Sequence, residues 1–253
     1  MAKKQKKCII NKDKKFIDTF FYMNCGDSMK TTRRFEYKYI ISYKDYYKII
    51  DSVRSLLNHD QHGEDIDYPV HSIYLDDIYD AGAGDKAFGN QFHKKYRIRH
   101  YHNPSQKKLE LKEKVGNIST KHSIELSNEL YDGIVKGDLN VLEQHFEKEL
   151  IRRFTLTHLT AHLTPRAYIK YHREAYKDKD DNLRLTFDSS LSVSRYVGDD
   201  EGVYIKLLPD TMLILEIKYE HYLPKEIKTI LNQITLTQIA YSKYFLGYDQ
   251  LFN

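Results

Sequence analysis

The sequence predicts an α+β fold in which antiparallel strands form a barrel or a sandwich and a few helices pack on it. Two observations predict this class. Apolar and charged residues alternate in most segments after residue 33, which is typical of half-buried strands, and helical spacing interrupts this alternation in only a few places. With 253 residues, 30% of them charged and 41% hydrophobic, the chain can form one large domain or two small ones with a sizeable core.

The start of the chain differs in composition from the rest. The segment "MAKKQKKCIINKDKKF" is basic, and no apolar stretch of secretory-signal length follows it. We expect residues 1–30 to be a basic, flexible tail, either solvated or able to contact acidic lipid or a polyanion, and residues 31–253 to be the folded domain. Cys8 and Cys25 both precede the first strand pattern, so no disulfide framework is indicated and a reducing, cytoplasmic setting is expected.

The strand patterns lie at residues 33–42, 68–77, 94–102, 107–114, 120–127, 166–177, 183–188, 192–197 and 211–219. A helix is predicted after Ser42, because Asp45 three residues later completes a capping box and apolar residues follow at helical spacing. Two further helices are predicted, at residues 138–151 and from Pro224 to about Leu246, with Gly247 placed to end the second.

Several strands carry charge on one face. In "KYRIRHY", Lys95, Arg97 and Arg99 share a face, and "RFEYKY", "LELKEK" and "LILEIKY" repeat the pattern. Two geometries satisfy it: an open sheet with its charged face in water, which needs no ligand, or a closed barrel with a charged interior. The second needs a polyanion, because unpaired buried cations are costly. Arg and Lys bind phosphate, and interspersed glutamates fit a divalent cation such as Mg²⁺ or Mn²⁺.

Residues from about 33 to 250 resemble the VTC-type polyphosphate polymerase domain of the triphosphate tunnel metalloenzyme, or CYTH-like, superfamily. The matching segments, in the order of that family, are "RFEYKY", "SIYLDD", "YRIRHY", "LELKEK", "YHREAY", "LRLTFDSSL", "LEIKY" and "YSKYFLG". The resemblance implies an eight-stranded antiparallel β-barrel tunnel with helices packed on the outside. It also implies that the tunnel binds ATP or inorganic polyphosphate together with a divalent metal.

The resemblance assigns roles to individual side chains. The residues that hold and activate phosphate groups are expected to be Lys38, Arg97, Arg99, Lys112, Arg173 and Lys218. Further substrate-binding residues are expected to be Lys121, Ser242 and Lys243. Glu216 is the expected ligand of Mn²⁺ or Mg²⁺, and Glu36 and Glu110 are additional metal candidates. Tyr171 is expected to be a packing residue, and Arg184 and Asp188 to form a structural pair.

The first strand favours one branch of the superfamily. Members that act as hydrolases or cyclases carry ExExK there, whereas Arg34 replaces the first carboxylate in this chain. The expected function is therefore metal-dependent transfer of the ATP γ-phosphate to a growing polyphosphate chain. Hydrolysis of tripolyphosphate or a nucleoside triphosphate, and polyphosphate binding without catalysis, stay open as alternatives. Nucleic acid is not an expected partner, and a separate membrane subunit and a position at the inner face of a membrane are left open.

Overall fold

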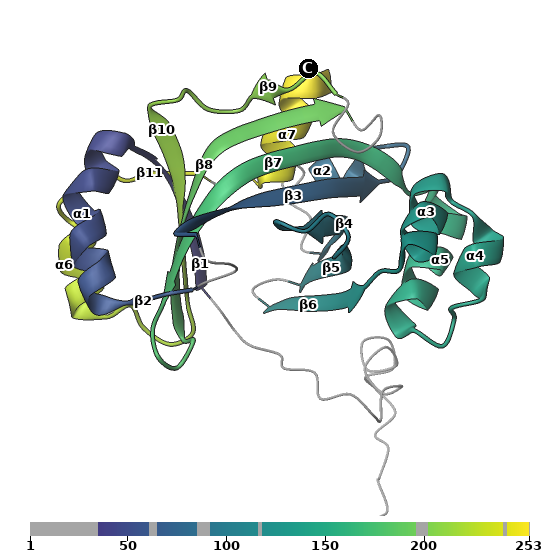
Figure 1. The fold of residues 1–253 in the computed structure, drawn as a ribbon, viewed down its shortest axis with the longest axis horizontal. Coiled ribbons are helices and arrows are strands. Elements are labelled where there is room, and N and C mark those ends of the chain that lie inside the picture. Colours follow the sequence, from purple (N-terminus) through teal and green to yellow (C-terminus); the bar gives the residue numbers. More distant parts are fainter. Residues whose placement is uncertain are drawn as a thin grey trace, which may run out of the picture. The chain divides into compact units, whose positions relative to one another are not determined.

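The computed structural model describes residues 35–60, 65–84, 92–115, 118–195, 202–239 and 242–252. The chain divides into two units, Met1–Thr31 and Thr32–Asn253, and all described residues belong to the second unit. This unit is built on one antiparallel β-sheet with helices packed against it (Figure 1). The predicted α+β class is confirmed, while the predicted basic tail and Arg34 lie outside the described residues.

Eight long strands make up most of the sheet. They are β1 (Phe35–Ser42), β3 (Asp67–Asp76), β4 (Phe92–His100), β5 (Lys108–Val115), β6 (Ile118–Glu125), β7 (Thr164–Lys177), β8 (Leu183–Arg195) and β10 (Met212–Tyr219). Three two-residue strands extend it: β2 (Asn58–His59) on β7, β9 (Ile205–Lys206) on β8 and β11 (Thr237–Gln238) on β1. The two strands predicted at 183–188 and 192–197 are one strand, β8, because Ser190 with φ 52° accommodates a bulge opposite β7 and the ladder then resumes.

The expectation of a closed barrel is wrong. The strand order is β11-β1-β10-β8-β7-β3-β4-β5-β6, and within the described residues no backbone ladder joins β6 to β1. Part of the reason is β11, which occupies the outer edge of β1 by pairing Gln238 with Tyr39 and Thr237 with Ile40. The backbone groups there are already used and cannot pair with β6. The sheet is therefore curled but open (Figure 1).

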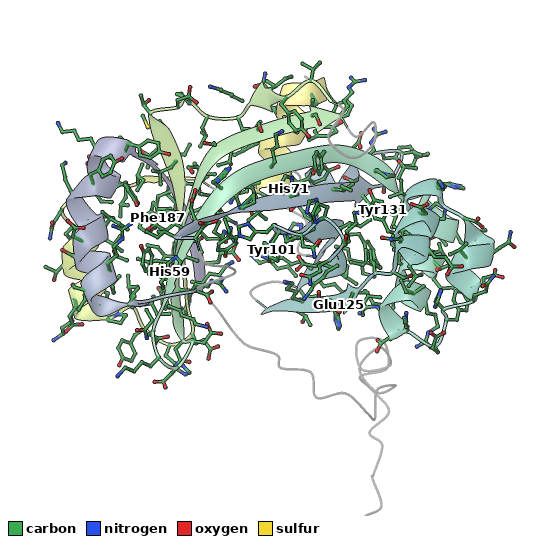
Figure 2. All side chains as sticks on the ribbon, viewed as in Figure 1. His59, His71, Tyr101, Glu125, Tyr131 and Phe187 are labelled. Carbon is green, nitrogen blue, oxygen red and sulfur yellow. The ribbon has the colours of Figure 1, made fainter. Side chains whose placement is uncertain are left out.

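Two groups of helices cover one face of the sheet, which we call the outer face, whereas the last helix packs against the opposite face. Helices α1 (Tyr43–Leu56) and α6 (Lys225–Leu231) pack on β1, β10 and β8, with Phe187 in the apolar layer between them. Helices α3 (Asn128–Lys136), α4 (Leu139–Glu143) and α5 (Glu149–Ala161) cover β3, β4 and β5 in a second layer that includes Tyr131 (Figure 2). The opposite face, which we call the inner face, carries the charged residues of the strand patterns.

The predicted start of α1 is confirmed. The Ser42 hydroxyl accepts a hydrogen bond from the Asp45 backbone N–H at 3.1 Å, which satisfies one of the unpaired donors of the first turn. Ile49, Ile50 and Val53 are buried on the face that meets the sheet. The apolar spacing therefore gave both the position and the orientation of this helix.

The helix predicted at 138–151 corresponds to two helices, α4 and the start of α5, and a further helix, α3, precedes them. Helix α3 was not predicted; Ser127 caps its N-terminus and Gly137, with φ 68°, ends it in the left-handed conformation. The Asp138 side chain then caps the short α4 by accepting from the Asn140 N–H, and α5 ends at His162, which also has a positive φ of 53°. Backbone turns at residues 144–147 separate α4 from α5, whose start has no side-chain cap, so apolar spacing alone presented this segment as one helix.

The helix predicted from Pro224 to Leu246 is also divided. It consists of α6, the short β11 and α7 (Lys243–Phe252), and Gly247 lies inside α7 instead of ending it. A Cβ at Gly247 would come within 3.0 Å of both Ile169 Cδ1 and Val193 Cγ2, so the glycine permits α7 to approach β7 and β8 closely. In the described part of the chain, no helix is both long and apolar enough to cross a bilayer.

Candidate anion-binding site

The inner face of β1 and β10 is an array of alternating charges. The register places Lys38 opposite Glu216 and Glu36 opposite Lys218, so each cation faces a carboxylate across the ladder. The Nζ of Lys38 lies 2.6 Å from Glu36 and 4.0 Å from Glu216, and the Nζ of Lys218 lies 3.2 Å from Glu216. The strand alternation thus brings four of the predicted site residues together.

Glu216 lies at the centre of this array. Its side chain is 6% exposed, and Arg173 of β7 approaches it at 3.7 Å in addition to the two lysines. Burial raises the pKa of its carboxyl, but Lys218, Lys38, Lys243 and Arg173 together outweigh burial and hold the pKa well below its usual range. Glu216 is therefore ionised, and each of these contacts is 3.2 Å or longer.

For Lys218, burial outweighs the neighbouring opposite charges. Burial lowers the pKa of its ammonium group, and although Glu216 and Glu36 favour the charged form, the result is a pKa of about 8. Lys112 and Arg173 contribute to this lowering by like-charge repulsion. An additional anion beside Lys218 would offset that repulsion and raise the pKa of Lys218 toward its usual value.

Asp188 of β8 is fully buried and binds two predicted phosphate ligands. Its oxygens accept from Nε and Nη2 of Arg173, each at 2.7 Å, and it lies 2.6 Å from Nζ of Lys243 at the start of α7. The predicted pair of Asp188 with Arg184 is wrong, because the antiparallel register sets Asp188 beside Arg173 while Arg184 binds Asp60.

A second group of charges comes from β4, β5 and β6. Glu110 binds Arg97 at 2.6 Å and Lys121 at 2.5 Å, so one carboxylate holds cations from the two neighbouring strands. Burial raises the pKa of Glu110, but Arg97, Arg99 and Lys121 hold it far below its usual range. The three cations and Glu110 thus form a compact unit on the inner face.

Arg99 differs from the other inner-face cations. Its Nε donates to the Ser72 hydroxyl at 3.0 Å and its Nη2 to the Tyr171 hydroxyl at 3.2 Å, and the residue is 6% exposed. Within the described residues no carboxylate lies in ion-pair distance of its guanidinium group. The neighbouring Tyr74 responds to this excess charge: burial raises its pKa, yet Arg97 and Arg99 outweigh burial and lower it.

Tyr171 is more than the packing residue that the sequence analysis expected. In addition to accepting from Arg99, its ring lies 5.3 Å from the Arg173 guanidinium carbon and 5.1 Å from the Lys243 Nζ. These distances suit cation–π contacts. Tyr171 therefore links the two groups of charges, and its place two residues before Arg173 was the signal that would have found it.

Side chains also bridge the open sides of the sheet. Lys112 of β5 binds Glu36 of β1 at 3.0 Å, although no backbone ladder joins these two strands. Lys95 of β4 donates to the Ser242 hydroxyl at 3.3 Å, next to Lys243. The predicted phosphate and metal ligands therefore lie on or against the inner face of the curled sheet and are linked to one another by ion pairs and hydrogen bonds.

A family comparison agrees with this arrangement. The profile of the VTC domain matches residues 33–252, which is nearly the whole chain. The chain belongs to the VTC domain family. The predicted family resemblance is confirmed, and membership supports a function related to triphosphate or polyphosphate. A comparison with curated proteins gave no match.

Solved structures with a similar arrangement share little sequence with this VTC domain. HpAC1 from Hippeastrum, described as a candidate adenylyl cyclase with a dominant triphosphatase activity, is 15% identical, with 86% of this chain and 96% of that chain covered and a TM-score of 0.49. A candidate adenylate cyclase from Bacillus halodurans is 12% identical, with coverages of 90% and 100% and a TM-score of 0.48. The PH1819 protein from Pyrococcus horikoshii OT3 is 13% identical, with coverages of 85% and 96% and a TM-score of 0.44.

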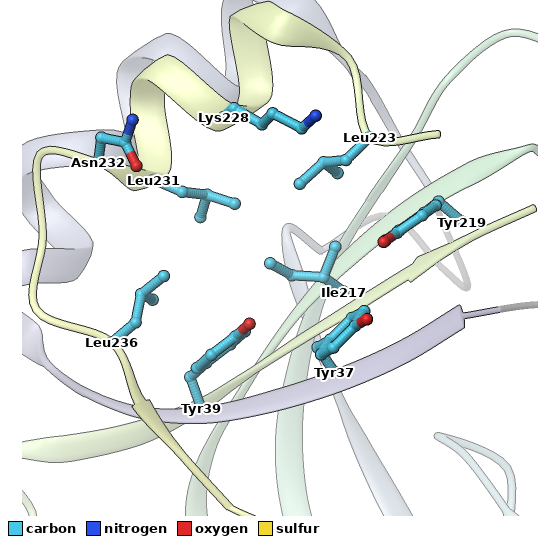
Figure 3. Close-up of a pocket in the computed structure, with 9 residues that line it drawn as sticks. All are labelled: Tyr37, Tyr39, Ile217, Tyr219, Leu223, Lys228, Leu231, Asn232 and Leu236. Atoms are coloured by element: carbon cyan, nitrogen blue, oxygen red, sulfur yellow. The ribbon is translucent and has the colours of Figure 1, made fainter. Parts of the chain in front are cut away.

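A separate pocket of about 220 Å³ lies on the outer face of this VTC domain (Figure 3). Tyr37, Tyr39, Ile217 and Tyr219 line it from β1 and β10, and these positions alternate with the charged inner-face residues of the same strands. Its lining is mainly aromatic and aliphatic. The pocket therefore does not have the chemistry of a phosphate site, and the inner face remains the candidate functional site.

Proposed function

We propose that this VTC domain is a polyphosphate polymerase that transfers the γ-phosphate of ATP to a growing polyphosphate chain. The observation that carries the proposal is the charge balance of the inner face, where eight predicted cationic ligands lie beside four carboxylates and seven of them form ion pairs with these carboxylates. The cations are Lys38, Arg97, Arg99, Lys112, Lys121, Arg173, Lys218 and Lys243. Such an excess of buried or half-buried positive charge is stabilised by a polyanion.

The protein side chains would act by positioning and by neutralising charge. Arg97, Arg99 and Arg173 would hold the β- and γ-phosphates, since guanidinium groups bind phosphate oxygens in pairs. A terminal oxygen of the polyphosphate chain attacks the γ-phosphorus, the bond to the β–γ bridging oxygen breaks, and ADP leaves with that electron pair. The attacking oxygen is already charged near neutral pH, so the step needs no general base.

Glu216 is the residue that would hold a divalent metal. Among the described residues no group of three or more His, Cys, Asp or Glu side chains converges as a complete metal site. Glu216 nevertheless fits one protein ligand of a hard cation, because it is ionised and its contacts are no shorter than 3.2 Å. Mn²⁺ or Mg²⁺ held there would neutralise charge on the transferred phosphate group.

The test is to incubate the purified protein with ATP and Mn²⁺ and to analyse the products by gel electrophoresis and phosphorus NMR. We expect long polyphosphate from the wild type and none from Glu216→Gln. Glu113→Gln is a matched control, because Glu113 is a half-buried carboxylate of β5 that pairs with Arg153 on the outer face. Orthophosphate as the sole product would replace the proposal with a hydrolase, and tight polyphosphate binding without turnover would replace it with a binding domain.

A further inference from the structure

Asp188 is the least exposed carboxylate of the inner face, and it joins two elements of the fold. Arg173 lies on β7 and Lys243 at the first residue of α7, so both depend on Asp188 for their closest ion pair. The Arg173 fork bound to Asp188 uses Nε and Nη2. Among the described residues Nη1 makes no hydrogen bond, which leaves a donor of this guanidinium for another acceptor.

The contacts of Asp188 distinguish it from Glu216. Both carboxylates are buried beside several cations, but Asp188 makes three contacts of 2.6 to 2.7 Å, whereas the contacts of Glu216 range from 3.2 to 4.0 Å. Short, bidentate contacts fix the orientation of a guanidinium group. Long contacts leave lone pairs accessible to a cation. The two carboxylates therefore have different tasks.

We infer that Asp188 is a positioning residue that holds Arg173 and Lys243 together as one phosphate-binding unit. This inference rests on the proposed function, because it concerns how the same site grips its polyanion. Asp188 therefore connects the start of α7 to the guanidinium group of Arg173 on β7. Tyr171 supports the unit from the other side, since both cations lie over its ring.

The inference predicts that removing the charge of Asp188 weakens tripolyphosphate binding, whereas net charge alone predicts tighter binding. Replacing Asp188 with asparagine makes the site more positive, and by charge alone tripolyphosphate would bind more tightly. If Asp188 orients the two cations, their loss of position instead weakens binding. The sign of the change therefore separates the two explanations.

The experiment is calorimetric titration of the full chain with inorganic tripolyphosphate, without added metal. We expect the Kd for tripolyphosphate to rise about tenfold or more in Asp188→Asn, and also in Asp188→Glu, which keeps the charge but moves the carboxylate. Asp80→Asn is the matched control: Asp80 holds Arg166 of β7 in a fork of the same geometry, at 2.7 and 2.8 Å, and its side chain also accepts a hydrogen bond from Tyr248. That control should bind like the wild type.

Several outcomes decide the question. Equal or tighter binding by a folded Asp188→Asn overturns the inference, and if that variant does not fold, unchanged binding by Asp188→Glu overturns it. Non-additive losses in the double variant with Lys243→Met support it, because both substitutions then remove the same unit. A wild type that binds no tripolyphosphate refutes the proposed function, and the inference with it, whereas a binding wild type with an unaffected Asp188→Glu refutes the inference alone.

Discussion

The substitution Arg99→Met is expected to leave the stability of the fold unchanged or higher and to weaken the binding of tripolyphosphate. Arg99 is a buried cation whose hydrogen bonds go to the hydroxyls of Ser72 and Tyr171. Two hydrogen bonds from a charged donor contribute about 1.5–3 kcal/mol each, whereas burial of an unpaired ion costs several kcal/mol. Methionine has a similar length and carries no desolvation cost. We therefore expect the unliganded variant to be as stable as the wild type, or more stable.

The effect on binding should be large. Loss of a desolvated arginine that binds phosphate costs about 2–3 kcal/mol, which corresponds to about a 30- to 150-fold rise in Kd. At a tripolyphosphate concentration of about 100 times the wild-type Kd, linkage gives about 2.7 kcal/mol of stabilisation. For a chain of this length, that corresponds to an increase in Tm of roughly 5–11 °C. In a variant with a 100-fold weaker Kd, the same concentration gives about 0.4 kcal/mol and a shift of about 1 °C.

The measurement is thermal unfolding of the wild type and Arg99→Met, each with and without tripolyphosphate. The matched control is Arg153→Met, which removes an arginine paired with Glu113 on the outer face and should leave the ligand-induced shift intact. The reasoning is refuted if Arg99→Met unfolds at a much lower temperature without ligand and yet keeps the full shift. That result would mean that Arg99 is a structural cation.

Three further expectations concern single residues. Burial raises the pKa of Asp188, but its ion pairs outweigh burial and hold the pKa below its usual value. The stability that these ion pairs contribute is therefore present above the unfolded pKa of about 3.9 and is lost as the pH falls through the folded pKa. In urea unfolding at a series of pH values, Asp188→Asn should lack this part of the acid dependence. Glu36→Gln should tighten tripolyphosphate binding several-fold in calorimetry, because Lys38 and Lys112 lose a partly exposed carboxylate that competes with phosphate; weaker binding would contradict this. Gly247→Ala should destabilise the fold by about 1–3 kcal/mol in the same unfolding assay, because its Cβ would crowd Ile169, and an unchanged midpoint would contradict close packing.

Strand alternation predicted much of the site. The period of two placed Lys38 on the same face as Glu36, and Glu216 on the same face as Lys218, without knowledge of the fold. It could not predict the register, because pairing Lys38 with Glu216 joins positions far apart in the chain. The family resemblance supplied the idea that these strands share one interior.

The errors have local physical causes. Alternation left an open sheet and a closed barrel both possible, and the family resemblance favoured the barrel; neither reveals that β11 occupies the edge of β1. Apolar residues continue past Leu231 at helical spacing, so the break between α6 and α7 was invisible, and Gly247 was interpreted as a helix end. Asp188 was paired with Arg184 because both lie on one strand face, whereas its cations come from the neighbouring strand and from α7.

The carboxylates of the inner face divide into fixed and exchangeable counterions. Asp188 and Glu110 are nearly inaccessible, and each binds two cations at 2.7 Å or less, so an incoming phosphate cannot displace them without leaving a charge buried. Glu36 is 24% exposed and holds Lys38 and Lys112 at the open side of the sheet, where a phosphate can take its place and the freed carboxylate can turn to solvent. A polyanion would therefore replace the Glu36 contacts first, while the cations held by Asp188 and Glu110 keep their geometry. This division lets an empty site of many cations stay folded and still bind a polyanion.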